Sequence, residues 1–438
     1  MSKKKLHIVS LGCSKNQVDT EVMLGKLGNY ELIDSANSAD VLIVNTCGFI
    51  ESAKAESIQT VLNLNKERKS GSTLVMAGCL SERYKDELKA ELVEVDIFTG
   101  VGDYAQIDKL ITKKQSGFSD SVFLSDGEDR IVINSNYHAY IKLAEGCNQA
   151  CSFCAIPSFK GKLHSRTVIS VIKEIAALRK KGFYDFSLIA QDSSSFGRDL
   201  ELKDGLISLI HTIDEMSEDF YARVLYLYPS TTSKKLIQTI AVSKKILNYY
   251  DMPIQHISDK MLKLMKRGLS KDKTIELLEN MRAVKDSFLR TAVIVGHPGE
   301  SEEDFNELAK FIEEFDFDMM SVFEYSDEEG TTAHNISEKV DRKTIRKRAT
   351  ILKKIIDKKL AKKAKNKIGE IISATIEGES DEHEFLLRAK AVLWAPDIDG
   401  DILINDTNDF KIAFGNRYKI QITDAKKSTL IAKIIDKC

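Results

Sequence analysis

The sequence has few cysteines and lacks both a long apolar run and a charge excess. Its 438 residues contain only seven cysteines, and a chain of this length is expected to form two to four domains. No run of eighteen apolar residues occurs, which excludes a transmembrane helix. With 64 Lys and Arg against 66 Asp and Glu, the near-neutral charge excludes a chain that coats nucleic acid along its whole length. A basic surface for binding a partner, if present, must be confined to one part of the chain.

The first residues, MSKKKLHIVSLGC, combine lysines, an apolar stretch and a cysteine, as a lipoprotein signal does. The apolar stretch is about half of the ~7 to 15 residues that such a signal needs. We therefore predict a first β-strand here and a cytoplasmic protein that makes no membrane contact. An odd number of cysteines in such a chain favours metal binding or catalysis over disulfides.

Three short apolar segments near the start, HIVSLGC, VLIVNTC and LVMAGC, each end in a cysteine: Cys13, Cys47 and Cys79. Their spacing fits one βαβ unit each, and the segments between them have helical patterning. Parallel strands would bring the three thiols to the carboxyl edge of one sheet, where α/β folds bind ligands. The alternative is three separate buried structural cysteines.

The middle of the chain repeats an apolar strand followed by a helix-compatible segment. The six expected strands lie in residues 140–147, 186–194, 222–229, 249–256, 290–300 and 321–326. Six βα units predict a partial, TIM-like (β/α)6 barrel, with its functional rim just beyond the strands.

The last third changes composition twice. Residues 342–367 contain thirteen Lys or Arg and one Asp, with apolar residues at helical spacing. This basic amphipathic helix either contacts nucleic acid or the ribosome, or is a connecting helix with a solvated face. From about residue 369 the pattern alternates with period two, which predicts a small five-stranded antiparallel β-barrel. The only tryptophan, Trp394, fits packing or a turn as well as a ligand contact.

The stretch CNQACSFCAIPSFKG contains three cysteines within eight residues: Cys147, Cys151 and Cys154. A full 4Fe-4S cluster takes four cysteines, so this CxxxCxxC set leaves one iron without a protein ligand. As at an open catalytic zinc site, chemistry can enter at the free position. Structural zinc is the alternative, but it needs a fourth ligand, and only His164 is nearby.

CxxxCxxC with Phe153 before its last cysteine, on the first strand of a six-fold βα barrel, resembles the radical S-adenosylmethionine (SAM) superfamily. The resemblance implies that the open iron binds SAM, and that an electron from the cluster cleaves SAM to give a 5′-deoxyadenosyl radical. The radical then removes hydrogen from an unreactive carbon. SAM would therefore be the missing fourth ligand.

Two cysteine triads, a radical SAM barrel and a small terminal barrel, in this order, resemble the radical SAM methylthiotransferases over essentially the whole chain. This resemblance implies a second 4Fe-4S cluster on Cys13, Cys47 and Cys79, and a terminal barrel of the TRAM type. It also implies two SAM molecules per turnover, one as methyl donor and one as radical source. An electron donor such as flavodoxin or ferredoxin would supply the reducing equivalents.

Within that family, some members modify tRNA adenosines and others an aspartate of ribosomal protein S-twelve. IPSFKG, residues 156–161, stands where tRNA-modifying members typically have a Pro-Tyr-Thr-Arg-Gly-like sequence. SLGCSKNQVDTEVM and RAKAVLWAPDIDG also resemble the ribosomal-protein branch. The resemblance therefore favours methylthiolation of the β-carbon of an aspartate in ribosomal protein S-twelve, with nucleic-acid contact secondary.

Further SAM contacts are expected at the barrel rim, where the strand ends place Gln191, Asp192, Arg223, Gly296 and Gly299. The two glycines could admit the adenosine close to the backbone or could simply form a turn. An arginine on a strand could pair with the SAM carboxylate or with an internal acid.

Two other functions remain open at this point. A tRNA adenosine methylthiotransferase would use the same chemistry, and the basic helix favours it, whereas IPSFKG and the neutral charge do not. A non-enzymatic iron-sulfur carrier would need clusters but no SAM pocket. We expect four parts: residues 1–130 with one cluster, the radical SAM core 131–335, the linker helix 336–368 and the TRAM barrel 369–438.

Overall fold

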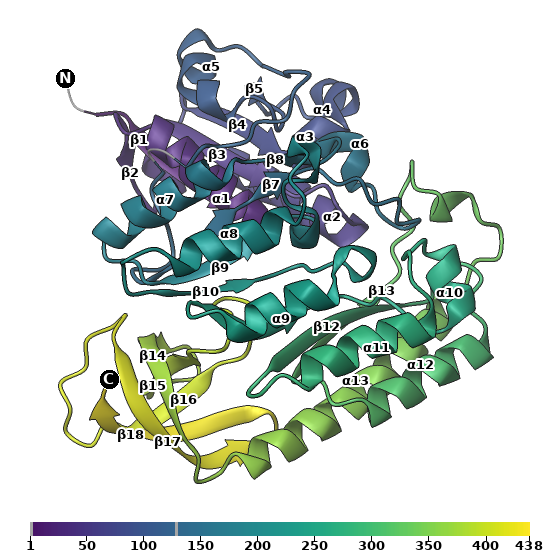
Figure 1. The fold of residues 1–438 in the computed structure, drawn as a ribbon. Helices are drawn as coiled ribbons and strands as arrows, with labels where there is room; N and C mark the ends of the chain where they lie inside the picture. The colour runs from purple at the N-terminus through teal and green to yellow at the C-terminus, as the bar shows by residue number, and fades with distance from the viewer. Residues whose placement is uncertain (1–2, 128–129) are drawn as a thin grey trace.

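The computed structural model describes residues 3–127 and 130–438. Three bodies follow one another along the chain (Figure 1): an N-terminal α/β sheet, a curved sheet covered by helices, and a C-terminal β-barrel. A single long helix, α13 (Arg342–Asn366), leads from the second body to the third.

The N-terminal body is a five-stranded parallel sheet of order β2-β1-β3-β4-β5. This is a doubly wound order, with its switch point between β1 and β3. Side chains of α1 and α5 pack on one face, and side chains of α2 and α4 on the other. The predicted parallel strands and intervening helices are confirmed. Their bounds are β1 Lys5–Ser10, β2 Glu31–Leu32, β3 Val41–Thr46, β4 Thr73–Gly78, β5 Ile97–Phe98, α1 Ser14–Lys26, α2 Glu51–Glu67, α3 Cys79–Arg83, α4 Lys85–Glu91 and α5 Ile107–Lys113.

The second body is a six-stranded parallel sheet of order β13-β12-β11-β10-β9-β6, which confirms the partial barrel. Its strands are β6 His138–Lys142, β9 Asp185–Ile189, β10 Tyr221–Val224, β11 Ile246–Asp251, β12 Phe288–Val295 and β13 Met319–Glu324. Its main helices are α7 Val168–Lys180, α8 Gly205–Asp214, α9 Lys234–Val242, α10 Asp259–Leu264, α11 Lys271–Arg282 and α12 Glu302–Glu314. Apolar side chains on the outer face of the strands and on these helices form the largest core.

A short excursion interrupts the first βα unit of this barrel. The strand predicted over residues 140–147 divides into β6 and the two-residue β7 (Ala144–Glu145), which pairs antiparallel with β8 (His164–Ser165). The cysteine loop and α6 (Ile156–Lys160) lie between β7 and β8. The β7/β8 pair therefore closes the base of the loop that carries the second cysteine triad.

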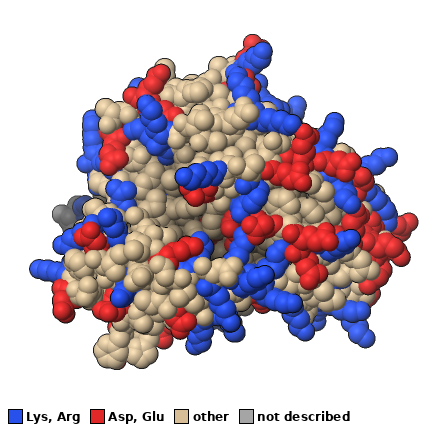
Figure 2. All heavy atoms as spheres, turned by 60° about the horizontal axis from the view of Figure 1, so that its bottom comes forward, with Lys and Arg blue, Asp and Glu red and all other residues tan. Residues whose placement is uncertain are grey.

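The basic helix α13 is mainly a connecting helix. Its apolar stripe, which includes Ile345 and Leu352, is buried against the barrel core. Several of its cations are paired internally, since Arg348 contacts Glu300 at 2.7 Å and Lys363 contacts Asp316 at 2.8 Å. Lys and Arg side chains are interspersed with Asp and Glu over the face in Figure 2. None of the helices in the described ranges has the length and apolarity needed to cross a membrane.

The C-terminal body is a closed five-stranded barrel, as predicted, of order β14-β15-β16-β18-β17. All of its strand pairs run antiparallel except β16 with β18, which is parallel. Its strands are β14 Ile371–Ser380, β15 His383–Ala391, β16 Ile402–Asp406, β17 Arg417–Lys426 and β18 Thr429–Lys437.

The loop between β15 and β16 packs into the inner face of the half-barrel. Ala395 is fully buried there with Tyr140 and Tyr249 of the barrel strands, and Trp394 packs beside them. The Tyr140 hydroxyl donates to the Pro396 carbonyl at 3.0 Å. The C-terminal barrel thus covers an apolar inner surface that six strands alone would leave open.

Candidate active site formed by two cysteine triads

The first triad lies at the carboxyl edge of the N-terminal sheet. Cys13 follows β1, Cys47 follows β3 directly, and Cys79 is the first residue of α3 after β4. The parallel register aligns the ends of β3 and β4, so these chain positions meet at one edge. Cys13 and Cys47 flank the switch point of the sheet, which is the usual ligand site of such folds.

Close backbone packing brings Cys13 and Cys47 together. Gly12 has φ +87°, and a Cβ atom on this residue would lie 2.9 Å from the Cys47 sulfur. Only glycine accepts this conformation without strain. Gly12 is therefore the residue that lets the Cys13 loop lie directly against Cys47.

Asn16 ties the three strand ends together. Its amide nitrogen donates to the carbonyls of Leu11 and Thr46 at 3.1 and 2.9 Å, and its amide oxygen lies 3.4 Å from the Cys79 sulfur. The side chain is almost fully buried. Our sequence analysis did not single out Asn16, although its position three residues after Cys13 is a local signal.

The second triad lies on one short loop held from several sides. The Cys147 amide donates to the Gly161 carbonyl at 3.1 Å, and the Cys154 amide donates to the Cys151 carbonyl at 3.2 Å. Between the cysteines, Ser152 donates its amide to Met265 and shares a 2.9 Å hydrogen bond with His297. This loop borders a hollow of about 500 Å³ whose lining includes all three cysteines, Lys162, Lys266, Thr331 and Thr332.

Arg267 and Tyr228 border this triad. Arg267 Nη1 lies 3.1 Å from the Cys151 sulfur, and the Tyr228 hydroxyl lies 3.5 Å from it. The guanidinium also stacks over the Tyr228 ring, 4.2 Å from the ring centre. Neither residue was among the predicted site residues.

The free thiols of both triads are the ligand type that iron-sulfur clusters take. Burial raises the pKa of Cys147 to about 11 and that of Cys154 to about 12, and it also raises the pKa of Cys47. Such thiols stay protonated at neutral pH unless a metal displaces the proton. In the described ranges no three candidate ligands converge as a single metal ion requires. Ligands of a four-iron cluster sit at its separate corners and lie farther apart.

A buried ionic network joins the two triads. Lys160, at the end of α6, lies 3.4 Å from both Asp19 and Glu145, and Lys142 contacts the same two carboxylates. All four side chains are buried. Burial opposes the charge of Glu145, but Lys142 and Lys160 outweigh it and hold its pKa at about 2. Because α6 follows Cys154 and also packs on α3, the network couples both cysteine sites.

Gln191 and Asp192 lie next to the second triad. Gln191 Nε2 donates to Glu145 at 3.0 Å, whereas its Oε1 is buried and has no hydrogen-bond partner among the described residues. Asp192 accepts from Gln149, in the cysteine loop, at 2.8 Å. Gln191 therefore has an acceptor to offer a ligand, while Asp192 supports the loop.

Arg223 does not lie with the thiols. Its guanidinium is fully buried in a bidentate pair with Asp185, the first residue of β9, and also donates to the Val392 carbonyl at 2.9 Å. Because both terminal nitrogens of the guanidinium already donate to protein groups, Arg223 cannot bind a ligand carboxylate with two hydrogen bonds. The internal pairing considered for strand arginines is the one found.

Gly296 and Gly299 form a tight turn after β12. Both have positive φ, +82° and +83°. A Cβ on Gly296 would lie 2.3 Å from Ile345 of α13, so its absence admits the helix. The turn also carries His297, the partner of Ser152, and therefore positions the cysteine loop.

Three family descriptions together match most of the chain. Residues 5–100 match "Uncharacterized protein family UPF0004", residues 141–312 match the "Radical SAM superfamily" and residues 368–435 match the "TRAM domain". Membership of the radical SAM superfamily implies a 4Fe-4S cluster and SAM, and the N-terminal match is consistent with a second cluster.

Curated relatives match over the full length. The chain is 56% identical to "Ribosomal protein uS12 methylthiotransferase RimO" of Sulfurovum sp. (strain NBC37-1), with 100% of each chain covered. It is 58% identical to the protein of the same name from Sulfurimonas denitrificans, with 98% of each covered. Among solved structures, the radical SAM methyltransferase TsrM from Kitasatospora setae has a similar fold, with a TM-score of 0.55, 14% identity, and 74% of this chain and 73% of that chain covered. The chain belongs to the RimO family of radical SAM methylthiotransferases.

Proposed function

We propose that this chain attaches a methylthio group to the β-carbon of an aspartate in ribosomal protein uS12, using two 4Fe-4S clusters and two SAM molecules per turnover. The names of the full-length relatives support the substrate. The observation that carries the proposal is structural: two triads of three thiols, each one short of a complete ligand set, are joined by one buried network.

In this proposal Cys147, Cys151 and Cys154 hold the cluster that binds SAM, and Cys13, Cys47 and Cys79 hold the other. When bound, the groups supply reductive cleavage of SAM at the second triad and a methylated sulfur at the first. The β-carbon of an aspartate has no acid-base route to this substitution, so the chain must place substrate and SAM in contact and exclude water.

Several residues contribute to that placement. Gln191, with its free buried oxygen, is assigned as a SAM contact, and Asp192 as a support of the cysteine loop through Gln149. Gly299, which is only partly buried, is assigned as a backbone contact for the adenosine, together with its neighbour Gly296, whose side-chain space Ile345 fills. We do not assign Arg223 to SAM, because Asp185 and Val392 occupy it.

The division of labour follows the parts of the chain. Residues 1–130 hold the sulfur-bearing cluster and residues 131–335 generate the radical; residues 336–368 link these parts to the TRAM barrel, residues 369–438. The exposed Lys162 and Lys266 beside the second triad suit an acidic electron donor such as flavodoxin or ferredoxin. We assign the reaction to the cytoplasm, where its ribosomal substrate is made.

The test is a competition between the two substrate classes of this chemistry. The protein is reconstituted without oxygen and supplied with SAM, a reductant, unmodified uS12 and unmodified tRNA, and both substrates are read by mass spectrometry. A hydrogen-to-methylthio mass gain on one aspartate of uS12 is expected. The same gain on a tRNA adenosine, with uS12 unchanged, would overturn the substrate assignment but not the chemistry.

A further inference from the structure

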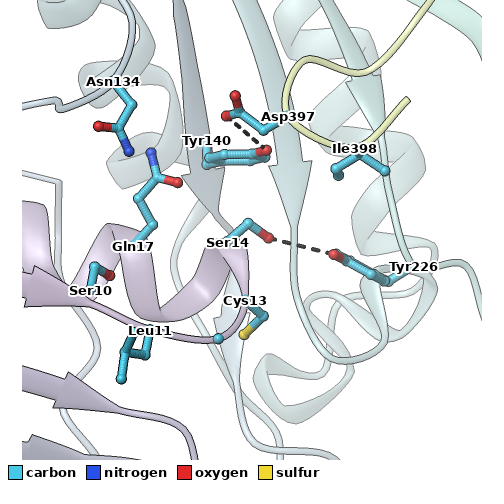
Figure 3. A pocket seen from close by; sticks show the side chains of 11 residues that line it. Ser10, Leu11, Cys13, Ser14, Gln17, Asn134, Tyr140, Tyr226, Asp397 and Ile398 are labelled. Atoms are coloured by element: carbon cyan, nitrogen blue, oxygen red, sulfur yellow. Dashed lines mark hydrogen bonds between the residues drawn. The ribbon is translucent and has the colours of Figure 1, made fainter. Parts of the chain in front are cut away.

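A pocket beside Cys13 is built from all three bodies of the chain (Figure 3). It encloses about 260 Å³. One wall is the Cys13 loop and the start of α1, the opposite wall is Tyr140 and Tyr226 of the half-barrel, and Asp397 of the C-terminal barrel closes the side. Cys13, a proposed cluster ligand, is an exposed residue. A ligand in this pocket would therefore lie next to the first cluster.

Tyr226, on the barrel wall of the pocket, has a backbone conformation that is unusual for a bulky residue. Tyr226 has φ +62°, a value that costs a bulky residue about 1 to 3 kcal/mol. Its amide donates to Asp251 at 3.0 Å and its carbonyl accepts from the Ser193 amide at 3.0 Å. This conformation sends the Tyr226 hydroxyl to Ser14, at 3.5 Å, while Tyr228 reaches Cys151. Two residues of one segment thus contact the surroundings of both triads.

Lys15 has no anionic partner. Four lysines among the described residues are nine-tenths or more buried, and three of them, Lys142, Lys160 and Lys390, contact carboxylates. The fourth, Lys15, is 9% exposed and its ammonium lies 3.4 Å from the centre of the Tyr226 ring. In the described parts of the chain no ion pair or hydrogen bond involves this ammonium. It is also not among the buried atoms that lack a partner, so it reaches solvent and can accept an incoming anion.

We infer that Lys15, which lies against the Tyr226 ring at the border of the Cys13 pocket, binds the carboxylate of the substrate aspartate as that side chain enters the pocket. This rests on the proposed function and specifies how the site recognises its substrate. The Ser14 and Tyr226 hydroxyls and the N-terminus of α1, which no side chain caps, add donors on the same side. Asp397, which accepts a 3.4 Å hydrogen bond from Tyr140, also lines the pocket, and burial raises the pKa of this carboxyl and so favours its neutral form.

Electrostatic repulsion between the first cluster and an anionic substrate side chain explains why a cation is needed here. A cluster held by thiolates repels a second anion, and the repulsion is strong where water is excluded. A charge-assisted contact offsets it. Lys15, whose only contact of this kind among the described residues is with the Tyr226 ring, is placed to make it.

The test measures binding of two substrates to one holoenzyme. Protein carrying both clusters and SAM, without reductant, is titrated with unmodified uS12 and with uS12 whose target aspartate is changed to asparagine. Lys15→Met removes the charge at nearly constant size. We expect it to weaken binding of the aspartate form about 10- to 100-fold, the scale of a charged hydrogen bond, and to leave binding of the asparagine form nearly unchanged.

Two further variants separate charge from fold. Lys15→Arg keeps the charge and should recover part of the discrimination. Lys89→Met removes another N-terminal lysine that lies over an aromatic ring, 4.5 Å from the centre of Phe118, and should change neither affinity.

Three results would overturn the inference. The first is equal binding of both uS12 forms by the unaltered protein, and the second is an equal loss for both forms in Lys15→Met. Loss of iron from Lys15→Met would assign the lysine to the cluster instead and would also overturn it. Failure of the unaltered protein to methylthiolate uS12 after reduction is read separately and counts against the proposed function.

Discussion

Cys13, Cys47 and Cys79 come from three strand ends spread over most of a domain, whereas Cys147, Cys151 and Cys154 lie within eight residues of one loop. The first triad exists only when the parallel sheet has formed, and Gly12 and Asn16 adjust its spacing. The short spacing in the sequence already brings the second triad together, but contacts with other loops hold it in place, chiefly the hydrogen bond of Ser152 with His297. The first site therefore depends on sheet packing, and the second on loop contacts.

The largest expected effect comes from disturbing the sheet edge alone. In Gly12→Ala, the new Cβ would lie 2.7 Å from Cys47 Cβ at a positive φ, so the Cys13 loop must move. We expect the first cluster to be lost: iron content falls by about half, methylthiolation stops, and SAM cleavage continues. Iron analysis and product assays on the reconstituted protein measure this.

Gly161→Ala is the matched control for that substitution. Gly161 also has positive φ, +68°, but no atom within 4 Å of its added Cβ. It tests backbone strain beside the second triad without a steric clash, and both clusters should remain. Full iron content and normal product in Gly12→Ala would show that the first triad does not depend on this close approach.

The next effect concerns the network between the triads. Glu145→Gln leaves Lys142 and Lys160 buried with one carboxylate fewer. Removing one partner of a buried pair costs about 3 to 5 kcal/mol, and denaturant unfolding should show this loss at neutral pH. The exposed pair of Lys235 with Asp204 is the control, where Lys235→Met should leave the stability nearly unchanged because water screens the pair. Similar losses in both variants would argue against a structural role for the network.

The same carboxylate predicts a pH dependence. Lys142 and Lys160 hold the pKa of Glu145 at about 2, below its ordinary value of about 4.3. Its contribution is complete above the ordinary pKa and is lost as the pH falls toward 2. The unaltered protein should therefore lose more stability between about pH 5 and about pH 2 than Glu145→Gln. Parallel pH profiles of the two proteins would refute this origin.

The smallest effect is expected at a loop clamp. Ser152→Ala removes the 2.9 Å hydrogen bond to His297, worth about 1 kcal/mol, but leaves the backbone contacts of the loop. Iron at the second triad should pass to a chelator about fivefold faster. Ser158→Ala, which removes a 2.7 Å bond to Ala155 in the following turn, should have no such effect. If iron left Ser152→Ala and the unaltered protein at the same rate, the hydrogen bond to His297 would not be needed to hold the cysteine loop.

Residues that reach the site through regular elements could be predicted from sequence. The strand ends gave the edge where Cys13, Cys47 and Cys79 meet, because parallel strands end together. The short spacing of the second triad needed no fold at all. The order of the three bodies followed from changes in periodicity and agreed with the resemblance to the methylthiotransferases.

Residues that act across bodies could not be found in this way. Arg267 and Tyr228 reach Cys151 from separate loops, and Lys15 meets Tyr226 from another domain. No period or motif records such contacts. Arg223 was predicted at the rim from its strand, but strand position does not reveal that Asp185 already pairs with it.

The most direct test of two triads with separate roles compares Cys47→Ala with Cys151→Ala in the same anaerobic assay. The assay follows 5′-deoxyadenosine and methylthiolated uS12 together. We predict that both variants lose the product and that only Cys151→Ala also loses SAM cleavage. Unchanged cleavage in Cys151→Ala, or lost cleavage in a Cys47→Ala protein that retains the second cluster, would contradict the account.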